Sequence, residues 1–344
     1  MKIENPRKLY NKIIRKKFIF IFLLLFFLII LLLFNISIGS SSIKLSEIIE
    51  AIFKNTGKGN SVMIIKQIRL PMALMAIAVG ATLGIGGCEI QSILRNPIAS
   101  PYTLGITSAA SFGAAMGIVL NNSILNLPET FVITGNAFFF AFLVSFGIYI
   151  FSSHRQANKT SIILFGIALN FLFSSLTMIL QYIADEDKLQ SLIFWNFGSL
   201  LKTTWNKLYT VLIVLTICMI FLSKNLWKLT AMTLDDTKAR SLGVDVIKVR
   251  KQTILLTSLL AAIAVSFVGT IGFVGLIAPH IARALVGEDQ RFFLPLSAIL
   301  GAFILSLAFL MSKIVIPGVI LPIGLVTSVI GIPFFISIIF GKKE

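Results

Sequence analysis

Charged side chains are scarce in this chain of 344 residues, and cysteine and histidine are scarcer still. Only 13% of the residues are charged, whereas 57% are hydrophobic and the mean hydropathy is +0.95. A water-soluble domain of this composition would have more apolar surface than its interior could bury. The composition therefore excludes a soluble globular protein and indicates a chain that resides in a lipid bilayer.

The two cysteines and two histidines form no pattern typical of a disulfide framework or a metal site. Cys88 and Cys218 lie far apart within apolar segments, which favours a role as small core residues. His280 has no His, Cys or carboxylate neighbour at ligand spacing, and His154 lies beside Arg155 in a loop. The sequence also offers no nucleophile with a nearby base, so we expect no metal, no cofactor and no catalytic residue in this chain.

Acidic residues are few, at 14 against 30 lysines and arginines. Thirteen of the 14 fall in loops or tails, and only Glu89 lies within an apolar segment. Ion-coupled secondary transporters usually carry carboxylates at membrane depth to bind the driving ion, so this scarcity disfavours that alternative. Glu89 itself is compatible with two interpretations, a functional carboxylate or one that pairs with Arg95 near the interface.

The net charge of +16 does not indicate a nucleic-acid-binding protein. The basic residues stand between apolar runs instead of gathering on one surface, and most of the 30 Phe residues lie inside those runs. Lipid contact and helix packing account for these aromatic residues without any base to stack on. We therefore expect membrane lipid as a partner and no nucleic acid.

Ten apolar segments are long enough to cross a bilayer as helices. They are residues 18–38, 72–93, 102–120, 131–152, 160–182, 208–223, 253–269, 271–287, 292–312 and 322–340. The first could be a signal peptide, but its length and the lack of a clear cleavage site favour an uncleaved helix. The seventh and eighth are separated only by Gly-rich apolar sequence, which allows a broken or re-entrant helix there.

The basic residues are divided unevenly between the two sides of a ten-span chain. One side holds 21 of the 30 lysines and arginines and the other holds 9. The positive-inside rule places the first side in the cytoplasm, with the basic segment 1–17, the loop 224–252 and the tail 341–344. We therefore predict an all-α polytopic protein of the bacterial cytoplasmic membrane, with a single ten-helix domain at 18–340.

Six blocks of sequence resemble, in order, the FecCD-type permease family, which imports ferric siderophores, haem and cobalamin. They are RLPMALMAIAVGATLGIGG at 69–87, RNPIASPYTLGITSAASFGAA at 95–115, FWNFGSL at 194–200, ARSLGV at 239–244, GFVGLIAPHIARALVGEDQRFFLPLSAILGA at 272–302 and LPIGLVTSVIGIPFF at 321–335. The blocks extend over almost the whole chain.

The resemblance implies a permease subunit that pairs with itself or with a similar second chain. It also implies cytoplasmic ATPase subunits, which use ATP and Mg, and an extracytoplasmic substrate-binding protein. The chain has no G-x-x-x-x-G-K-[ST] loop of its own, so a partner must hydrolyse the ATP. Ferric siderophore is the expected substrate, with haem or cobalamin as the alternatives.

The resemblance gives the loop 224–252 a role in coupling to the ATPase. From its residues alone the loop allows two short helices that meet at Gly243, as a docking element would have, but a solvated connector is the favoured interpretation. The spacing of Ala239 and Gly243 would place two small residues on one helical face, where a partner can approach closely. The expected coupling residues are Asp236, Ala239, Arg240, Leu242 and Gly243.

Two further sets of residues have alternative interpretations. The resemblance implies that Lys66, Arg69 and Lys313 dock the binding protein, whereas basic residues at helix ends are commonly interfacial anchors. The glycines of the second and third spans indicate close helix packing, although a smooth substrate path would use them too. They are Gly84, Gly86, Gly87, Gly105, Gly113 and Gly117.

Overall fold

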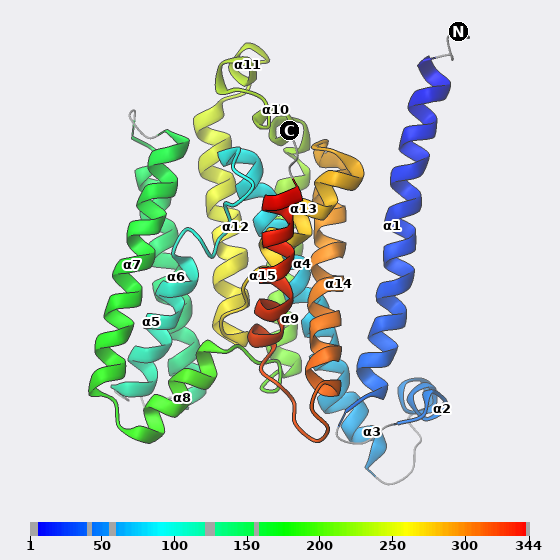
Figure 1. Ribbon diagram of the computed structural model, residues 1–344, viewed down its shortest axis with the longest axis vertical. Coiled ribbons are helices and arrows are strands. Elements are labelled where there is room, and N and C mark those ends of the chain that lie inside the picture. Colours follow the sequence, from blue (N-terminus) through cyan, green and yellow to red (C-terminus); the bar gives the residue numbers. More distant parts are fainter. Residues whose placement is uncertain (1–5, 40–42, 55–59, 121–127, 155–157, 342–344) are drawn as a thin grey trace.

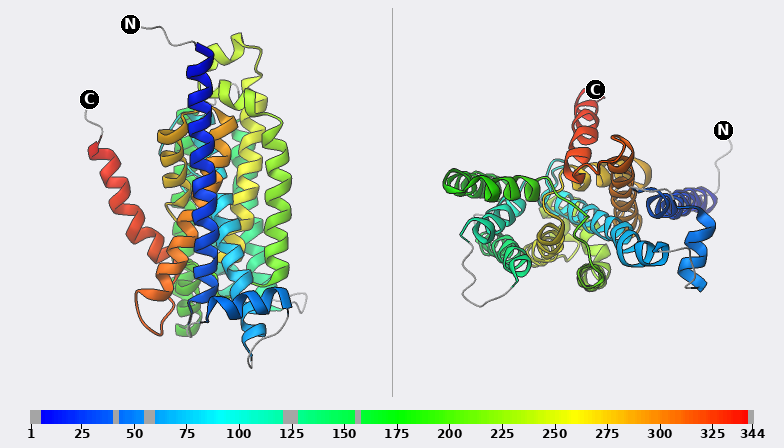
Figure 2. Two further views of the ribbon diagram at one scale, coloured as in Figure 1. Left: turned by 90° about the vertical axis from the view of Figure 1, so that its right-hand side faces the viewer. Right: turned by 90° about the horizontal axis from the view of Figure 1, so that it is seen from below.

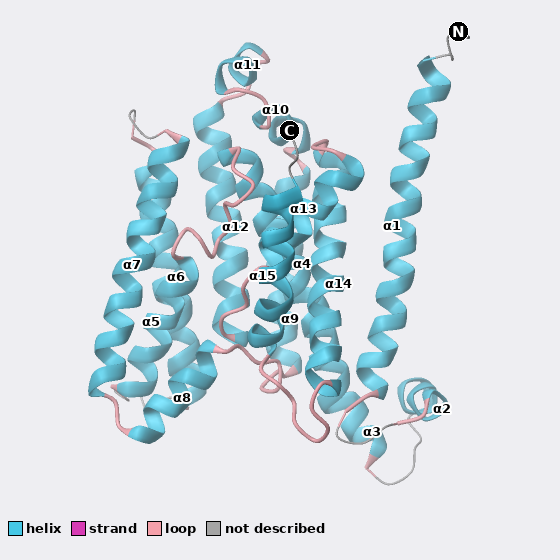
Figure 3. Ribbon diagram, in the orientation of Figure 1, coloured by secondary structure: helices cyan, strands magenta, loops and turns pink. Residues whose placement is uncertain are grey.

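The computed structural model describes residues 6–39, 43–54, 60–120, 128–154 and 158–341. Within these ranges every regular element is a helix and no strand occurs (Figure 3). The expected all-α fold is confirmed.

Ten principal helices correspond one to one with the ten expected spans. They are α1 (Pro6–Ser37), α4 (Leu70–Leu94), α5 (Ile106–Val119), α6 (Glu129–Phe151), α7 (Lys159–Ile183), α9 (Trp205–Ser223), α12 (Val246–Val268), α13 (Val274–Val286), α14 (Gln290–Ile314) and α15 (Ile323–Gly341). Seven of the apolar segments among the described residues are long enough to cross a membrane, while α5, α13 and α15 supply three shorter ones.

Short helices cap the two ends of the bundle. At one end are α10 (Leu226–Met232) and α11 (Asp236–Ser241), together with the start of α1 and the end of α15 (Figure 1). At the other end are α2 (Leu45–Ile49), η1 (Glu50–Lys54), α3 (Ser61–Met63), η2 (Ile64–Arg69) and α8 (Glu186–Asn196). The start of α1 and the end of α15 thus lie at the same end of the bundle, as an even number of spans requires.

Helix α4 is the centre of the molecule and packs against α12, α13 and α14. A Cβ atom added at Gly80 would lie 2.4 Å from the carbonyl oxygen of Gly301, and one at Gly87 would lie 1.7 Å from that of Gly275. A Cβ at Gly113 of α5 would likewise lie 2.3 Å from the Asn136 carbonyl oxygen in α6. These glycines allow helix backbones to touch, so the packing interpretation of the small residues is correct.

The outer helices expose large apolar side chains in all directions. Seen from below, α1 and α7 lie at opposite edges of the bundle (Figure 2). Phe22 on α1 and Phe171 on α7 are each about two-thirds exposed, as is suitable for side chains that contact lipid tails.

The chain between α12 and α13 is broken, as the Gly-rich sequence there allowed. Gly269 and Phe273 have positive φ angles of 76° and 65°, and α13 is only 13 residues or about 20 Å long. The backbone N–H of Ser199 donates to the Val268 carbonyl at 2.7 Å, and the N–H of Gly324 donates to the Phe197 carbonyl at 2.9 Å. Irregular backbone at this depth is therefore hydrogen-bonded by protein, as a bilayer interior requires.

Candidate functional site

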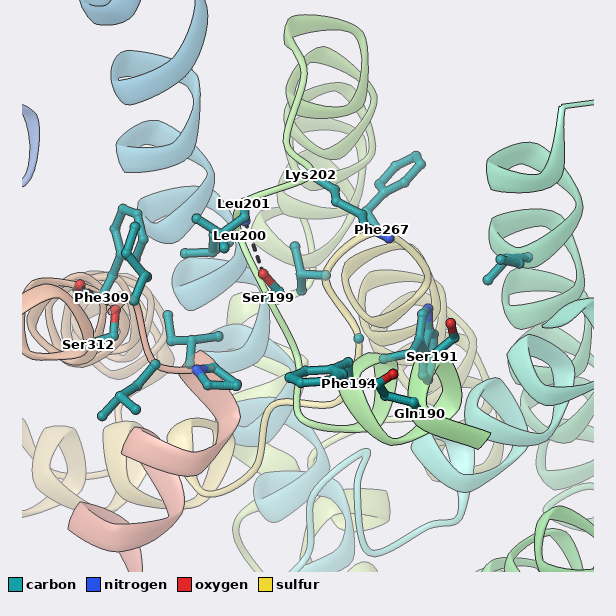
Figure 4. Close-up of a pocket in the computed structure, with 18 of the residues that line it drawn as sticks. Gln190, Ser191, Phe194, Ser199, Leu200, Leu201, Lys202, Phe267, Phe309 and Ser312 are labelled. Carbon is teal, nitrogen blue, oxygen red and sulfur yellow. Dashed lines mark hydrogen bonds between the residues drawn. The ribbon is translucent and has the colours of Figure 1, made fainter. Parts of the chain in front are cut away.

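A cavity of about 600 Å³ opens at the end of the bundle that carries α8. In Figure 4, α8 contributes Gln190, Ser191 and Phe194, and the segment 199–202 lies across from it. Helix α14 adds Phe309 and Ser312, so parts of the chain more than 100 residues apart line one space. The irregular segments described above thus form the wall of a cavity.

The lining of this cavity, which we name the outer cavity after the side that the distribution of basic residues predicts for it, is mainly apolar and aromatic. Its charged lining residues are Glu129 at the start of α6 and Lys202. The N–H of Leu201 donates to the Ser199 hydroxyl at 3.2 Å and fixes the turn that carries Lys202 (Figure 4). A mainly apolar lining offers a solute few hydrogen bonds, so this cavity is suited to transient contact with a solute and not to tight binding.

At the opposite end, α11 ends in a Schellman motif around Gly243. The N–H of Gly243 donates to the Arg240 carbonyl at 2.8 Å, and the N–H of Val244 donates to the Ala239 carbonyl at 3.1 Å. Gly243 has a φ of 80°, which a residue without a Cβ adopts at little cost. The glycine stop expected in this loop is therefore present, with α11 before it and α12 after it.

The structure corrects the expected small-residue face of α11. Ala239 is completely buried and packs in the main core, whereas Gly243 lies beyond the helix and is exposed. The two residues therefore do not share an exposed face. The spacing rule failed because the helix ends at Ser241, so that Gly243 no longer follows the helical rotation.

Asp236 also faces the interior of the chain. Its carboxylate contacts the Lys159 ammonium at 2.8 Å and the Arg250 guanidinium at 2.7 Å, and Arg250 itself is buried. Partial burial raises the pKa of Asp236, but hydrogen bonds from Lys159 and Arg250 outweigh that effect and hold the pKa below its ordinary value. Asp236 thus anchors α11 to α7 and α12, while Asp235 pairs with Arg95 at 3.5 Å.

The exposed surface of α11 and its flanks consists of other residues. Leu242 is 50% exposed and Leu234 is 43% exposed, and Lys238 and Arg240 are also exposed. Two large apolar side chains beside two cations form a surface that a partner protein could cover. Of the expected coupling residues, Arg240, Leu242 and Gly243 therefore lie on the surface, and Asp236 and Ala239 support it from within.

Two of the expected docking residues bind the end of α1. The Arg69 guanidinium donates to the carbonyl oxygens of Ile36 at 2.9 Å and Ser37 at 2.8 Å. The Lys313 ammonium donates to the backbone carbonyl of Asn35 at 2.7 Å and to its side-chain oxygen at 3.1 Å. Arg69 is buried, and neither side chain extends freely from the outer face.

Lys66 lies in η2 on the same end of the molecule and is half-buried. Its carbonyl oxygen accepts a hydrogen bond from the Trp205 indole at 3.0 Å. The structure thus brings Lys66, Arg69 and Lys313 to one end of the bundle, where two of them hold the C-terminus of α1.

Glu89 is fully buried near the end of α4, and both of its carboxylate oxygens lack a hydrogen-bond partner among the described residues. Arg95, the expected partner, pairs with Asp235 instead. The interpretation of Glu89 as a carboxylate paired with Arg95 is therefore wrong. Burying this group in its charged form would be costly without a partner.

The candidate core cysteines and the histidine of PHIAR have structural surroundings. Cys88 and Cys218 are both buried and free. The imidazole of His280 lies edge-on to the Phe334 ring, with 6.4 Å between the ring centroids, and so joins α13 to α15. Across the part of the chain that the structure describes, no three His, Cys, Asp or Glu residues gather as metal ligands do.

Several polar residues within the spans have roles that the sequence did not predict. Asn35, within the first apolar run, donates to the Ser306 carbonyl at 2.9 Å and so joins α1 to α14. Gln290 donates to the Ser92 hydroxyl at 2.8 Å and joins α14 to α4. Ser174, Thr177 and Gln181 of α7 line a second cavity. These residues could have been recognised in the sequence as polar residues within apolar runs, and those of α7 also recur at helical spacing.

Comparison with known proteins agrees with this architecture. The family model of the FecCD transport family matches residues 27–341. The molybdate import system permease protein of Haemophilus influenzae is 35% identical, and the match covers 82% of each chain. The iron(3+)-hydroxamate import system permease protein of Bacillus subtilis is 32% identical over 89% of this chain and 92% of its own length.

A solved structure shows the same fold at high similarity. It is described as an inward-facing conformation of a metal-chelate type ABC transporter and superposes with a TM-score of 0.82 at 31% identity. The superposition covers 94% of this chain and 99% of the other. The ten-helix bundle, the family match and these relatives show that the chain belongs to the FecCD transport family and is the permease subunit of an ABC importer.

Proposed function

We propose that this permease moves ferric siderophore across the bacterial cytoplasmic membrane, driven by ATP that partner subunits hydrolyse with Mg. The likeness to a metal-chelate type transporter and to an iron(3+)-hydroxamate permease supports an oxygen-liganded iron complex as cargo. The molybdate relative shows that the family also serves other metal species.

The observation that carries the proposal is the placement of two features at opposite ends of one bundle (Figure 1). An apolar cavity lies at the end with α8, and the exposed surface of α11 lies at the end with both termini of the bundle. Solute entry at one end and energy input at the other suit a transporter whose ATPase is a separate subunit. The end that carries α11 is then cytoplasmic, as the distribution of basic residues predicts.

We further propose how the partners meet this chain. Arg240, Leu242 and Gly243 contact the cytoplasmic ATPase, and Asp236 and Ala239 fix the position of α11. The extracytoplasmic binding protein docks at the end that holds Lys66, Arg69 and Lys313. A second permease chain, identical or similar, completes the membrane part.

Reconstitution in liposomes tests the proposal. The permease is co-purified with its partner ATPase and binding protein, and uptake of labelled ferric hydroxamate, haem and cobalamin is compared. We expect ATP-dependent uptake of the ferric hydroxamate that persists when an ionophore abolishes the proton gradient. Uptake that depends on the proton gradient and not on ATP would refute the assignment as an ATP-driven importer. A preference for haem or cobalamin would show that one of these, and not ferric siderophore, is the substrate.

A further inference from the structure

One side of α7 is polar although the helix lies at membrane depth. Ser174, Thr177 and Gln181 recur at positions i, i+3 and i+7, so they lie on one face of the helix. Leu172 and Ile179, seven residues apart, lie on the opposite face of α7 and are highly exposed, as lipid-facing residues are. This stripe is separate from the outer cavity of Figure 4.

The polar stripe of α7 lines a second cavity, of about 280 Å³, which we call the polar cavity. Helix α5 contributes Thr107, Ser108 and Ser111 to it, again at helical spacing. Asn196 at the end of α8 and Thr270 in the break before α13 also line it, together with Tyr102 and Met178. No charged side chain belongs to this lining, in contrast to the outer cavity with Glu129 and Lys202.

Part of this polar lining is fixed by internal hydrogen bonds. The Ser111 hydroxyl donates to the side-chain oxygen of Asn196, and the Thr270 hydroxyl donates to the Asn196 backbone carbonyl. The Thr177 hydroxyl donates to the Phe173 carbonyl one turn earlier at 2.8 Å. These bonds hold Asn196 in one orientation, with its oxygen occupied and its NH₂ group left over as a donor.

Other lining groups make no hydrogen bond within the described residues. They are the hydroxyls of Thr107 and Ser174, the amide of Gln181 and the NH₂ group of Asn196. Polar groups at membrane depth are costly unless they meet water, protein or a solute. Hydroxyl and amide groups spread over α5, α7 and α8 can donate several hydrogen bonds to one solute that presents oxygen atoms.

We propose that the polar cavity binds the travelling solute by hydrogen bonds from uncharged donors, and that it selects metal complexes with oxygen atoms on their surface. A metal oxyanion fits the cavity whole, because about 280 Å³ is just below the ~300–1,000 Å³ of drug-sized sites. A larger ferric chelate would insert one oxygen-bearing face. The absence of lining charge lets the solute leave again, since an ion pair would hold it. This inference deepens the proposed function and rests on it.

The test compares variants that remove donors without changing shape. Thr107→Val and Gln181→Leu are combined, and uptake by the reconstituted transporter is measured with molybdate, ferric hydroxamate and haem as separate probes. Each lost hydrogen bond is expected to raise the apparent KM about threefold, so the double variant rises about tenfold for molybdate or ferric hydroxamate. Haem presents oxygen atoms only on the two propionate groups at one edge of an apolar ring, so its KM should stay within about twofold.

Thr216→Val is the matched control, because the Thr216 hydroxyl bonds the Leu212 carbonyl of its own helix, α9, on an exposed face. Elution of each variant complex as a single species verifies folding. A KM of the double variant equal to that of the control would overturn the polar cavity as a solute site. An equal rise for haem would overturn its selectivity. Wild-type protein that moves none of the probes with ATP would refute the proposed function itself.

Discussion

At the scale of single residues, Gly243 combines a conformational and a surface role. Its φ of 80° ends α11, and nothing lies within 4 Å of the position where its Cβ would stand. A larger residue must therefore adopt the unfavourable left-handed conformation, but its Cβ meets no other part of the chain. Strain and interface effects can thus be separated experimentally.

We predict that Gly243→Ala and Gly243→Trp destabilise the isolated permease equally, by roughly 1–2 kcal/mol, since both must adopt the left-handed conformation. Gly243→Asn should cost less. Only Gly243→Trp should also weaken ATPase binding, by about 1–3 kcal/mol, because it overpacks the contact. Thermal unfolding and titration with the ATPase measure the two effects. Equal ATPase affinity of the Ala and Trp variants would remove Gly243 from the interface.

At the scale of elements, α1 is held by side chains that bind its last carbonyl groups. A helix ends with four carbonyls that its own backbone cannot satisfy. Arg69 and Lys313 donate to three of these terminal carbonyls, and positive charge is favourable at a helix C-terminus. Asn35 adds a hydrogen bond to α14. These contacts connect residues far apart in sequence at the outer end of α1.

We predict that Lys313→Met lowers the stability of the permease by about 1–3 kcal/mol, because the buried Asn35 loses a donor to both of its oxygens. Thermal unfolding in detergent measures this, with the exposed Lys202→Met as the control for removal of a lysine at the same end. Wild-type stability of Lys313→Met would show that these hydrogen bonds do not fasten α1.

The same contacts determine which substitution can test docking. Charge reversal at Arg69 or Lys313 would break the end of α1 as well as any docking contact. Lys66→Glu tests docking at the same end of the bundle, because Lys66 lies in η2 and is half-buried. We predict slower association of the binding protein with Lys66→Glu and a weaker dependence of the rate on salt. An unchanged association rate would argue against Lys66 as a docking residue.

At the scale of the whole molecule, the charge distribution predicts the orientation in the membrane. Ser241 lies at the end of α11, and Asn60 precedes α3 at the opposite end of the bundle (Figure 1). We predict that an impermeant thiol reagent modifies Asn60→Cys in intact spheroplasts and reaches Ser241→Cys only after permeabilisation. The native cysteines are buried and should give little background. The reverse pattern of labelling would invert the orientation.

The start of α12 shows where hydropathy fails to predict a helix boundary. The seventh span was expected to start at residue 253, whereas α12 begins at Val246, with the Asp245 carboxylate accepting from the Lys248 N–H at 3.0 Å. The added residues 246–252 make about two turns and include Lys248, Arg250 and Lys251, and so polar a stretch gives no hydropathy signal. Capping chemistry marks this end, so a search for Asp before a helical repeat would have found it.

The sequence by itself determined the helical class, the ten spans and the family, because bilayer thickness imposes a length and an apolar composition on each span that need no partner to be recognised. Only the tertiary structure decided how the polar residues are used. Asp236 turns inward to Arg250, Lys313 binds an oxygen 278 positions away, and Glu89 has no partner where Arg95 was expected. Such pairings depend on the rotation and depth at which helices dock, and no periodicity within one helix encodes either.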